Sequence, residues 1–258
     1  MHLQYHSIIL VFSILLQAVF VDAARKCTDV MTDFTKGHEG WTELSGSKEG
    51  WSFTSQGLKM DLIPPEDPQP SKDKSEGGLP YNKNTSPSSP SFQYKDLVQY
   101  GRITFELKTA KAAGAITAAI LMAPGKDEID FEMLGGEPDK VQTNYFYGKN
   151  IVYGVNGGNH DVEDTTTGFH KYTIDWNAER IIYLFDGKVI RTVERKSTCK
   201  RAVCEYPTEA SHVQVGIWDA SKPASTAEWA KGPIDWKKYK SKPISAIIKS
   251  VKIECNSK

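Results

Sequence analysis

Three acidic residues alternate with apolar residues in the segment of residues 126–134, KDEIDFEML. Glu128, Asp130 and Glu132 stand at positions i, i+2 and i+4, the period of a β-strand, so their carboxylates share one face. On a helix the same residues would be spread around the axis. The segment therefore predicts a strand with one acidic and one apolar face. The apolar set consists of Ile129, Phe131 and Met133.

A strand face with three acids is unusual, because carboxylates are depleted from sheets and crowded like charges oppose joint ionisation. We therefore expect these acids to have a chemical function. The Cα atoms of Glu128 and Glu132 are expected roughly 13 Å apart along a strand. If the side chains lean together, their carboxyl groups can approach to about 5–5.5 Å, the separation of a retaining glycosidase pair. Asp130 can hydrogen-bond Glu128 and so separate the pKa values of the two glutamates. The alternative is a solvated face with accidental spacing.

Residues 126–135, KDEIDFEMLG, resemble the signature of glycoside hydrolase family 16, E-x-D-x-E followed by Leu-Gly. Together with the apolar segment Ala115–Met122 they look especially like the Crh branch of fungal cell-wall transglycosylases. The resemblance implies that Glu128 is the nucleophile, that Asp130 assists it, and that Glu132 is the general acid/base. Some family members have an extra residue before the last Glu, which makes a bulge; this chain has the unbulged form.

A second strand is predicted at residues 141–147, VQTNYFY, which resemble the family segment beside the acids. The candidate substrate contacts here are Gln142, Asn144, Tyr145 and Tyr147. Amides can bind sugar hydroxyls, and aromatic rings can cover the apolar faces of pyranoses. The two amides point to one side of the strand and the two tyrosines to the other, so packing in the core is the alternative for the tyrosines.

Two tryptophans are the candidate stacking platforms. Trp218 is the last residue of a predicted strand, residues 213–218, and Trp229 lies in the segment EWAKG, residues 228–232. Both segments resemble parts of the Crh branch whose tryptophans line sugar subsites. From composition alone, a buried core tryptophan is an equally good interpretation. Lys231 stands where the branch pattern has Gly, which could alter a subsite.

The rest of the chain has the pattern of an all-β domain. Alternating segments predict strands, and Asp186–Gly187 between two of them predicts a type I′ hairpin. The resemblance implies a concanavalin-like jelly-roll β-sandwich of two antiparallel sheets with an open substrate groove. The predicted strands outside the acidic segment include residues 57–63, 100–108, 115–122, 141–147, 169–176, 180–185, 188–193, 213–218 and 244–255.

Residues 64–91 are rich in Pro, Ser, Lys and Gly and predict a long exposed loop within one domain. Asn84 begins a glycosylation sequon in that loop. Residues 1–23 predict a secretory signal peptide, because an apolar run at 8–21 ends in small residues. An uncleaved anchor is the alternative, although the run is shorter than the roughly 20 residues of a spanning helix. Residues 24–258 then form one catalytic domain.

Four cysteines in a secreted chain favour two disulfides, for which three pairings are possible. Cys199 and Cys204 are close enough for a small local loop, which leaves Cys27 to pair with Cys255. No CxxC pair or histidine spacing predicts a metal site, and no cofactor is expected. The chain stops at Lys258 without an apolar tail, so no lipid anchor is predicted.

Lys plus Arg and Asp plus Glu number 32 each, so the formal net charge is zero and nothing predicts binding to nucleic acid or an anionic membrane. We expect a monomer in the cell wall or extracellular space, with polysaccharide as its partner. The predicted activity is a retaining transglycosylase that moves chitin-type chains onto β-glucan. The alternatives are an endo-β-1,3(4)-glucanase of the same fold and a non-catalytic glycan-binding protein.

Overall fold

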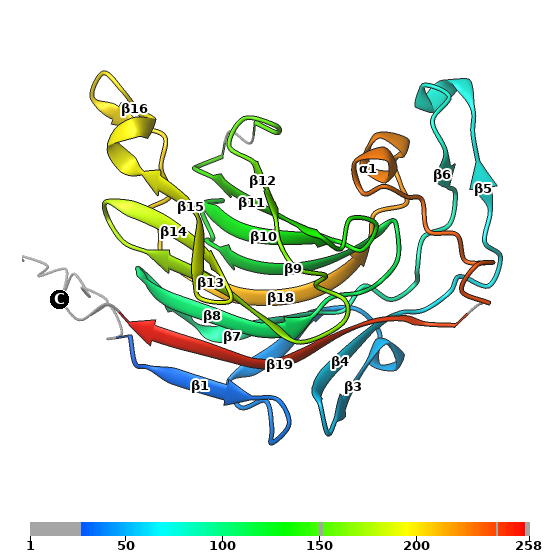
Figure 1. Cartoon of the computed structure of the whole chain (residues 1–258), viewed down its shortest axis with the longest axis horizontal. Helices are drawn as coiled ribbons and strands as arrows, with labels where there is room; N and C mark the ends of the chain where they lie inside the picture. The colour runs from blue at the N-terminus through cyan, green and yellow to red at the C-terminus, as the bar shows by residue number, and fades with distance from the viewer. Residues whose placement is uncertain (1–26, 150–151, 241, 256–258) are drawn as a thin grey trace, which may run out of the picture.

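The computed structural model describes residues 27–149, 152–240 and 242–255. The predicted signal peptide, residues 1–23, lies outside these ranges. Within them the fold is built on two large antiparallel sheets, as predicted, and it also contains one α-helix, which was not predicted (Figure 1). No helix in the described ranges is long and apolar enough to cross a membrane.

The front sheet, as we call the one that carries the acids, has seven strands in the order β12-β11-β10-β9-β18-β7-β2. Every pairing in it is antiparallel. Its strands are β2 (Trp41–Ser45), β7 (Ser91–Val98), β9 (Ala115–Met122), β10 (Glu128–Leu134), β11 (Lys140–Phe146), β12 (Gly158–Asp161) and β18 (Ser211–Asp219).

The back sheet has eight strands, seven of them in the order β15-β14-β13-β8-β19-β4-β3, with β1 also paired to β19. Its strands are β1 (Val30–Asp33), β3 (Trp51–Thr54), β4 (Gly57–Leu62), β8 (Gly101–Lys108), β13 (His170–Trp176), β14 (Arg180–Phe185), β15 (Lys188–Glu194) and β19 (Ile244–Cys255). The turn Asp186–Gly187 has φ values of 46° and 79°, both positive, which confirms the predicted type I′ hairpin.

Short elements stand at the two ends of the long strands (Figure 1). The helix α1 lies beside one two-stranded hairpin, and a second two-stranded hairpin follows β15. These elements are α1 (Ala224–Trp229), β5 (Pro70–Ser71), β6 (Tyr81–Asn82), β16 (Cys199–Lys200), β17 (Val203–Cys204) and the 3-10 turns η1 (Lys48–Gly50), η2 (Lys74–Glu76) and η3 (Arg195–Thr198).

The core between the sheets fixes the orientation of β10. Ile129, Phe131 and Met133 are almost fully buried, as their alternation predicted. The Phe131 ring packs edge-on against two back-sheet tyrosines, with centroids 5.6 Å from Tyr172 and 5.4 Å from Tyr183. Burying each such side chain contributes about 1.5–3 kcal/mol. This packing turns the other face of β10, which we call the acid face, away from the core.

The segment of residues 64–91 is more ordered than a long exposed loop. It contains the β5–β6 hairpin, and the Tyr81 side chain is buried in a small cluster with Ala224 and Ala227 of α1. Asn82 is buried too, and its Nδ2 donates to the carbonyl of Ile234 at 2.9 Å. The prediction of an exposed loop is therefore wrong for these anchor points, because contacts with residues more than 130 positions away hold them. Asn84 does lie on the surface.

Both expected disulfides form. Cys27 is bonded to Cys255 across a sequence separation of 228 residues, which joins the start of the described chain to the end of β19. Cys199 is bonded to Cys204 across five residues and closes the β16–β17 hairpin.

Replacing the two disulfides separately should destabilise the protein by different amounts. In the chain-entropy account a cross-link stabilises more when it closes a longer loop, so the Cys27→Ser/Cys255→Ser pair should cost about 5 kcal/mol and the Cys199→Ser/Cys204→Ser pair about 2 kcal/mol. Denaturant unfolding of the two double variants beside the wild type measures this. An equal loss in both variants would contradict the loop-length argument.

Candidate active site

Strand β10 presents three carboxylates between two neighbouring strands. Its partners β9 and β11 lie on either side, so none of the three acids is at a sheet edge. Asp130, in the middle, is 3% exposed, while Glu128 and Glu132 are half-buried. The predicted acidic face therefore exists, and the fold buries it deeply enough to change how its carboxyl groups ionise.

The register of the sheet shows which side chains share the acid face. On β11, Phe146 lies opposite Glu128, Asn144 opposite Asp130 and Gln142 opposite Glu132. Cross-strand partners point to the same side of a sheet, about 4.5–5.5 Å apart at Cβ. The structure therefore brings the two predicted amides, Gln142 and Asn144, beside the acids. On the other side, the β9 partners of the three acids are apolar: Met122, Ile120 and Ala118.

The glutamates have pKa values that favour acid–base work near neutrality. Burial raises the pKa of Glu128 to about 7, and the Lys126 ammonium opposes part of that rise. Burial also raises the pKa of Glu132 to about 7, and the charge of Glu128 adds to the rise. The two neighbouring charges act in opposite directions: Lys126 favours the ionised form of Glu128, and ionised Glu128 favours the protonated form of Glu132.

Asp130 is the most buried of the three acids. Burial raises its pKa well above the usual range, the charges of Glu132 and Glu128 raise it further, and Arg191 opposes them. Its Oδ1 atom is buried without a hydrogen-bond partner, and so is Oδ1 of Asn144 directly across on β11. A proton on Asp130 supplies the donor that two facing acceptor oxygens lack. The structure records no bond from Asp130 Oδ1 to Glu128, so the predicted hydrogen bond between them is not seen at this atom.

A fourth carboxylate, Asp127, organises the start of β10, and the sequence analysis did not identify it. It is 4% exposed and accepts three backbone N–H bonds: from Gly148 at 2.6 Å, from Thr208 at 2.6 Å and from Glu209 at 3.0 Å. These bonds tie the loop after β11 and the loop before β18 to the residue next to Glu128. The hydrogen-bond partners of Asp127 are 21 to 82 positions away, so no local pattern predicts them. The only signal in the sequence was the presence of a fourth acid just before the strand.

The two predicted tryptophans meet on the acid face near the Glu132 end of β10. Their rings are stacked, with centroids 5.8 Å apart and an interplanar angle of 18°. Trp229 Nε1 donates to Oε1 of Gln142 at 3.0 Å, and Gln142 lies opposite Glu132. Both rings are half-buried and pack on a separate apolar cluster. That cluster consists of Ile116, Leu134, Ala220 and Ala230.

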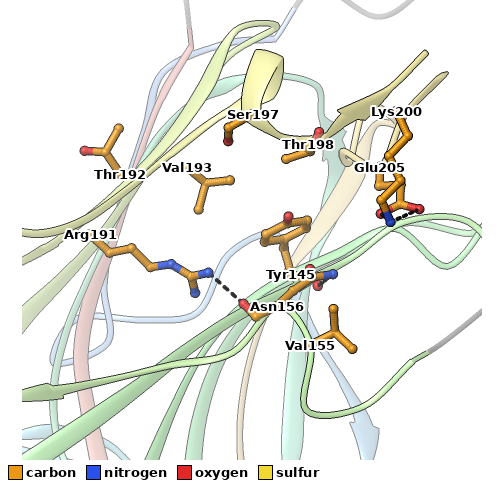
Figure 2. A pocket seen from close by; sticks show the side chains of 10 residues that line it. All are labelled: Tyr145, Val155, Asn156, Arg191, Thr192, Val193, Ser197, Thr198, Lys200 and Glu205. Atoms are coloured by element: carbon orange, nitrogen blue, oxygen red, sulfur yellow. Dashed lines mark hydrogen bonds and ion pairs between the residues drawn. The ribbon is translucent and has the colours of Figure 1, made fainter. Parts of the chain in front are cut away.

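Tyr145 and Tyr147 do not join this face. Tyr145 lies opposite Ile129 and is buried in the main core, which is the opposite side of the front sheet from the acids. It also lines a cavity of about 350 Å³ beside Arg191 and Asn156 (Figure 2). Tyr147 lies just beyond β11, packs against the core and hydrogen-bonds Glu205. The prediction that Tyr145 binds substrate beside the acids is therefore wrong, since the register assigns this residue to the core. The substrate contact of Tyr147 stays a prediction.

The family model of glycosyl hydrolases family 16 matches residues 58–238. The chain belongs to glycosyl hydrolase family 16. The match includes all of β10 and both tryptophans, so the candidate site lies inside the family-16 region.

Curated relatives in family 16 include Crh-like proteins of fungi. Crh-like protein 2 of Aspergillus fumigatus is 38% identical over 146 residues, which cover 54% of this chain and 33% of that protein. Crh-like protein CRH11 of Candida albicans is 32% identical over 182 residues, which cover 69% of this chain and 38% of that protein. The chain thus spans about a third of the length of these relatives.

Solved structures share the fold of this family-16 chain. A Crh5 transglycosylase in complex with NAG has a TM-score of 0.74 at 25% identity, covering 90% of this chain and 85% of that chain. A Bacillus licheniformis β-glucanase has a TM-score of 0.69 at 18% identity, covering 90% of this chain and 100% of that chain. The second likeness shows the fold alone, and both agree with the predicted jelly-roll sandwich.

Glu132→Gln should stabilise the protein increasingly as the pH rises. Because the folded-state pKa of Glu132 is raised from 4.5 to about 7, the native state holds a proton that the unfolded state has lost between these values. Wild-type stability therefore falls across that window, by up to about 3 kcal/mol, and the glutamine variant escapes this loss. Urea unfolding at pH 4, 6 and 8 measures the difference.

Glu205→Gln is a control for which the difference in stability from wild type should change with pH in the opposite direction. A hydrogen bond from Lys200 lowers the pKa of Glu205, so its ionised form contributes stability above the unfolded pKa. This variant should lose stability relative to wild type as the pH rises from 4 to 8. A pH-independent difference between Glu132→Gln and wild type would show that Glu132 ionises as freely in the native state as in the unfolded chain.

Proposed function

We propose that the chain is a secreted retaining transglycosylase of the cell wall, which transfers chitin-type chains onto β-glucan. The observation that carries the proposal is the row of three buried carboxyl groups on one face of β10, two of them with pKa values of about 7. The similarity to fungal Crh-like proteins and to a Crh5 transglycosylase supports transfer as the reaction.

The first half of the reaction uses both glutamates. Ionised Glu128 attacks the anomeric carbon of the donor sugar, and protonated Glu132 donates its proton to the glycosidic oxygen as that C–O bond breaks. The leaving chain departs with the proton, and the donor sugar is held as an ester of Glu128. The surrounding charges suit these roles, because Lys126 favours ionised Glu128, and the charge of Glu128 keeps a proton on Glu132.

In the second half of the reaction Glu132 acts as a general base instead of a general acid. Now ionised, it takes a proton from an acceptor hydroxyl, whose oxygen attacks the anomeric carbon and releases Glu128 as a carboxylate. Protonated Asp130 lies between the glutamates and keeps a third negative charge out of the row. A sugar hydroxyl as acceptor gives transfer, whereas water gives hydrolysis, so exclusion of water from the loaded site decides between the two.

The stacked pair Trp218–Trp229 is the candidate sugar platform of this reaction. The two rings offer an apolar surface next to Gln142, which lies opposite the proposed acid/base Glu132. An aromatic surface suits the apolar face of a pyranose, and the amide suits a hydroxyl. Asn84, the first residue of the sequon, is surface-exposed, which is consistent with a glycoprotein.

Glu128→Gln should abolish transfer without unfolding the protein. The amide cannot act as the nucleophile, so hybrid products from chitin oligomers and fluorescent laminarin oligomers should fall by at least about 10³-fold. Mass spectrometry of the product mixture detects the hybrids. Glu106→Gln, on back-sheet strand β8, is the matched control and should keep the wild-type product pattern.

The same assay separates the alternative functions. Shortened β-glucan oligomers without any hybrid would indicate an endo-β-glucanase. Binding of either oligomer without product from the wild-type protein would indicate a non-catalytic glycan-binding protein. An unchanged product pattern in Glu128→Gln would refute the proposed mechanism.

Glu132→Ala should lose turnover while substrate still binds. Removing the acid/base takes away protonation of the leaving oxygen, which is typically worth 10²–10⁴-fold in rate. Tryptophan fluorescence should still report saturable binding of chitin oligomers, because the Trp218–Trp229 pair is retained. If the variant fails to fold, as judged by its thermal transition, the acid row has a structural role instead.

A further inference from the structure

An unusually exposed apolar surface follows strand β11. Val152 is 54% exposed, Tyr153 80% and Val155 66%, and Tyr153 is the most exposed of the large apolar side chains in the described ranges. Single exposed apolar residues are common on protein surfaces, whereas a group of them beside a candidate site indicates a contact surface. The three lie within four positions of one another, so the feature needs an explanation.

Tyr153 reaches the acid face through Phe146, the cross-strand partner of Glu128. Its ring packs edge-on against Phe146, with centroids 5.7 Å apart at 75°. Phe146 lies directly opposite Glu128 and on the same side of the sheet, and it is only 8% exposed. Phe146 is one strand spacing, about 4.8 Å, from the proposed nucleophile. Tyr153 lies one ring contact beyond Phe146, and its ring remains largely open to solvent.

Hydrogen bonds fix Gly148, before Tyr153 in the chain, and Asn156, after it. Before it, Gly148 N donates to Oδ1 of Asp127 at 2.6 Å. After it, Asn156 Nδ2 donates to the carbonyl of Tyr145 at 3.2 Å, and Arg191 Nη2 donates to the carbonyl of Asn156 at 2.7 Å (Figure 2). Fixing these two points lowers the ordering cost of presenting the ring to a ligand.

We propose that Tyr153, backed by Phe146, is a second sugar platform that binds the donor chain, separate from the Trp218–Trp229 platform. The inference rests on the proposed function. The occupant is a neutral pyranose, because Tyr153 offers an exposed aromatic ring without a charge, and a pyranose has an apolar face to cover it.

The order of the acids along β10 assigns this platform to the donor. The donor's anomeric carbon must lie at Glu128, and the leaving or attacking oxygen must lie at Glu132. The C–O bond that breaks or forms at the anomeric carbon therefore points from Glu128 toward Glu132, with the donor sugar on the Glu128 side of that bond. Tyr153 lies at the Glu128 end and the tryptophan pair at the Glu132 end, next to Gln142. The two platforms flank the acid row.

Tyr153→Ala should raise the donor KM roughly 3- to 10-fold, the worth of one aromatic stacking contact. The acceptor KM and the ratio of transfer to hydrolysis should stay at wild-type values, because the acids and the tryptophan pair are untouched. Tyr153→Phe keeps the ring and should behave as wild type. The assay is initial-rate transfer from chitin oligomers to fluorescent laminarin oligomers, with each varied in turn.

Val189→Ala is the control for an exposed apolar residue elsewhere, since Val189 is 59% exposed on back-sheet strand β15. It should leave both KM values unchanged. All three variants should keep the wild-type thermal transition, because the altered side chains are largely solvated.

An unchanged donor KM in Tyr153→Ala, or a change confined to the acceptor KM, would overturn the donor platform. Loss of self-association in sedimentation, with an unchanged donor KM, would also overturn it and identify the patch as a contact between copies of the chain. If the wild-type protein gives no product at all, the proposed function fails. Direct binding of chitin oligomers to wild type and Tyr153→Ala by calorimetry then tests the platform separately, and equal affinities would refute it.

Discussion

The crowding of three carboxyl groups on one face of β10 is the constraint to which the rest of the structure responds. Glu128, Asp130 and Glu132 cannot all ionise in a half-buried row, because each charge raises the cost of the next. Without other stabilising contacts, a strand with three acids would form a sheet poorly. It is held by its other face, where Phe131 packs on Tyr172 and Tyr183 in a core shared by both sheets. Burial of the apolar face stabilises the strand. The acid face can therefore carry carboxyl groups that remain protonated at neutral pH.

The charges around the acid row make its two glutamates electrostatically different, although their side chains are identical. The charge of Lys126 lowers the pKa of Glu128, and the charge of Glu128 raises the pKa of Glu132, so identical side chains four residues apart have different electrostatic surroundings. Asp130 is the most buried of the three acids, and its pKa is raised well above the usual range, which favours its protonated form. Asp127, outside the row, is satisfied by backbone N–H groups from two loops. Strand β10 and the residue just before it therefore hold four carboxyl groups in distinct environments.

Elements at the ends of the sheets complete the site. The Tyr81 side chain packs on α1, and the Asn82 side chain bonds the carbonyl of Ile234 beyond it, so the segment of residues 64–91 supports the helix that carries Trp229. At the other end, Asp127 and Arg191 anchor the segment that carries Tyr153. Aromatic residues thus stand on both sides of the acids, although they come from elements that are distant in sequence. A retaining transfer between two chains needs binding surfaces on both sides of the reacting bond.

The sequence by itself determined the features that depend on near neighbours. The alternation of Glu128, Asp130 and Glu132 with apolar residues predicted both β10 and its two faces, because a strand repeats every two residues. Asp186–Gly187 predicted its turn, and the five-residue spacing of Cys199 and Cys204 predicted their disulfide. The tertiary structure alone decided features that depend on register and distant contacts. Tyr145 lies in the core because it is opposite Ile129, and Tyr153 packs edge-on against Phe146 while its ring stays largely exposed. The pairing of β10 with β11 assigns each side of β11 to the acids or to the core, and no local pattern encodes that register.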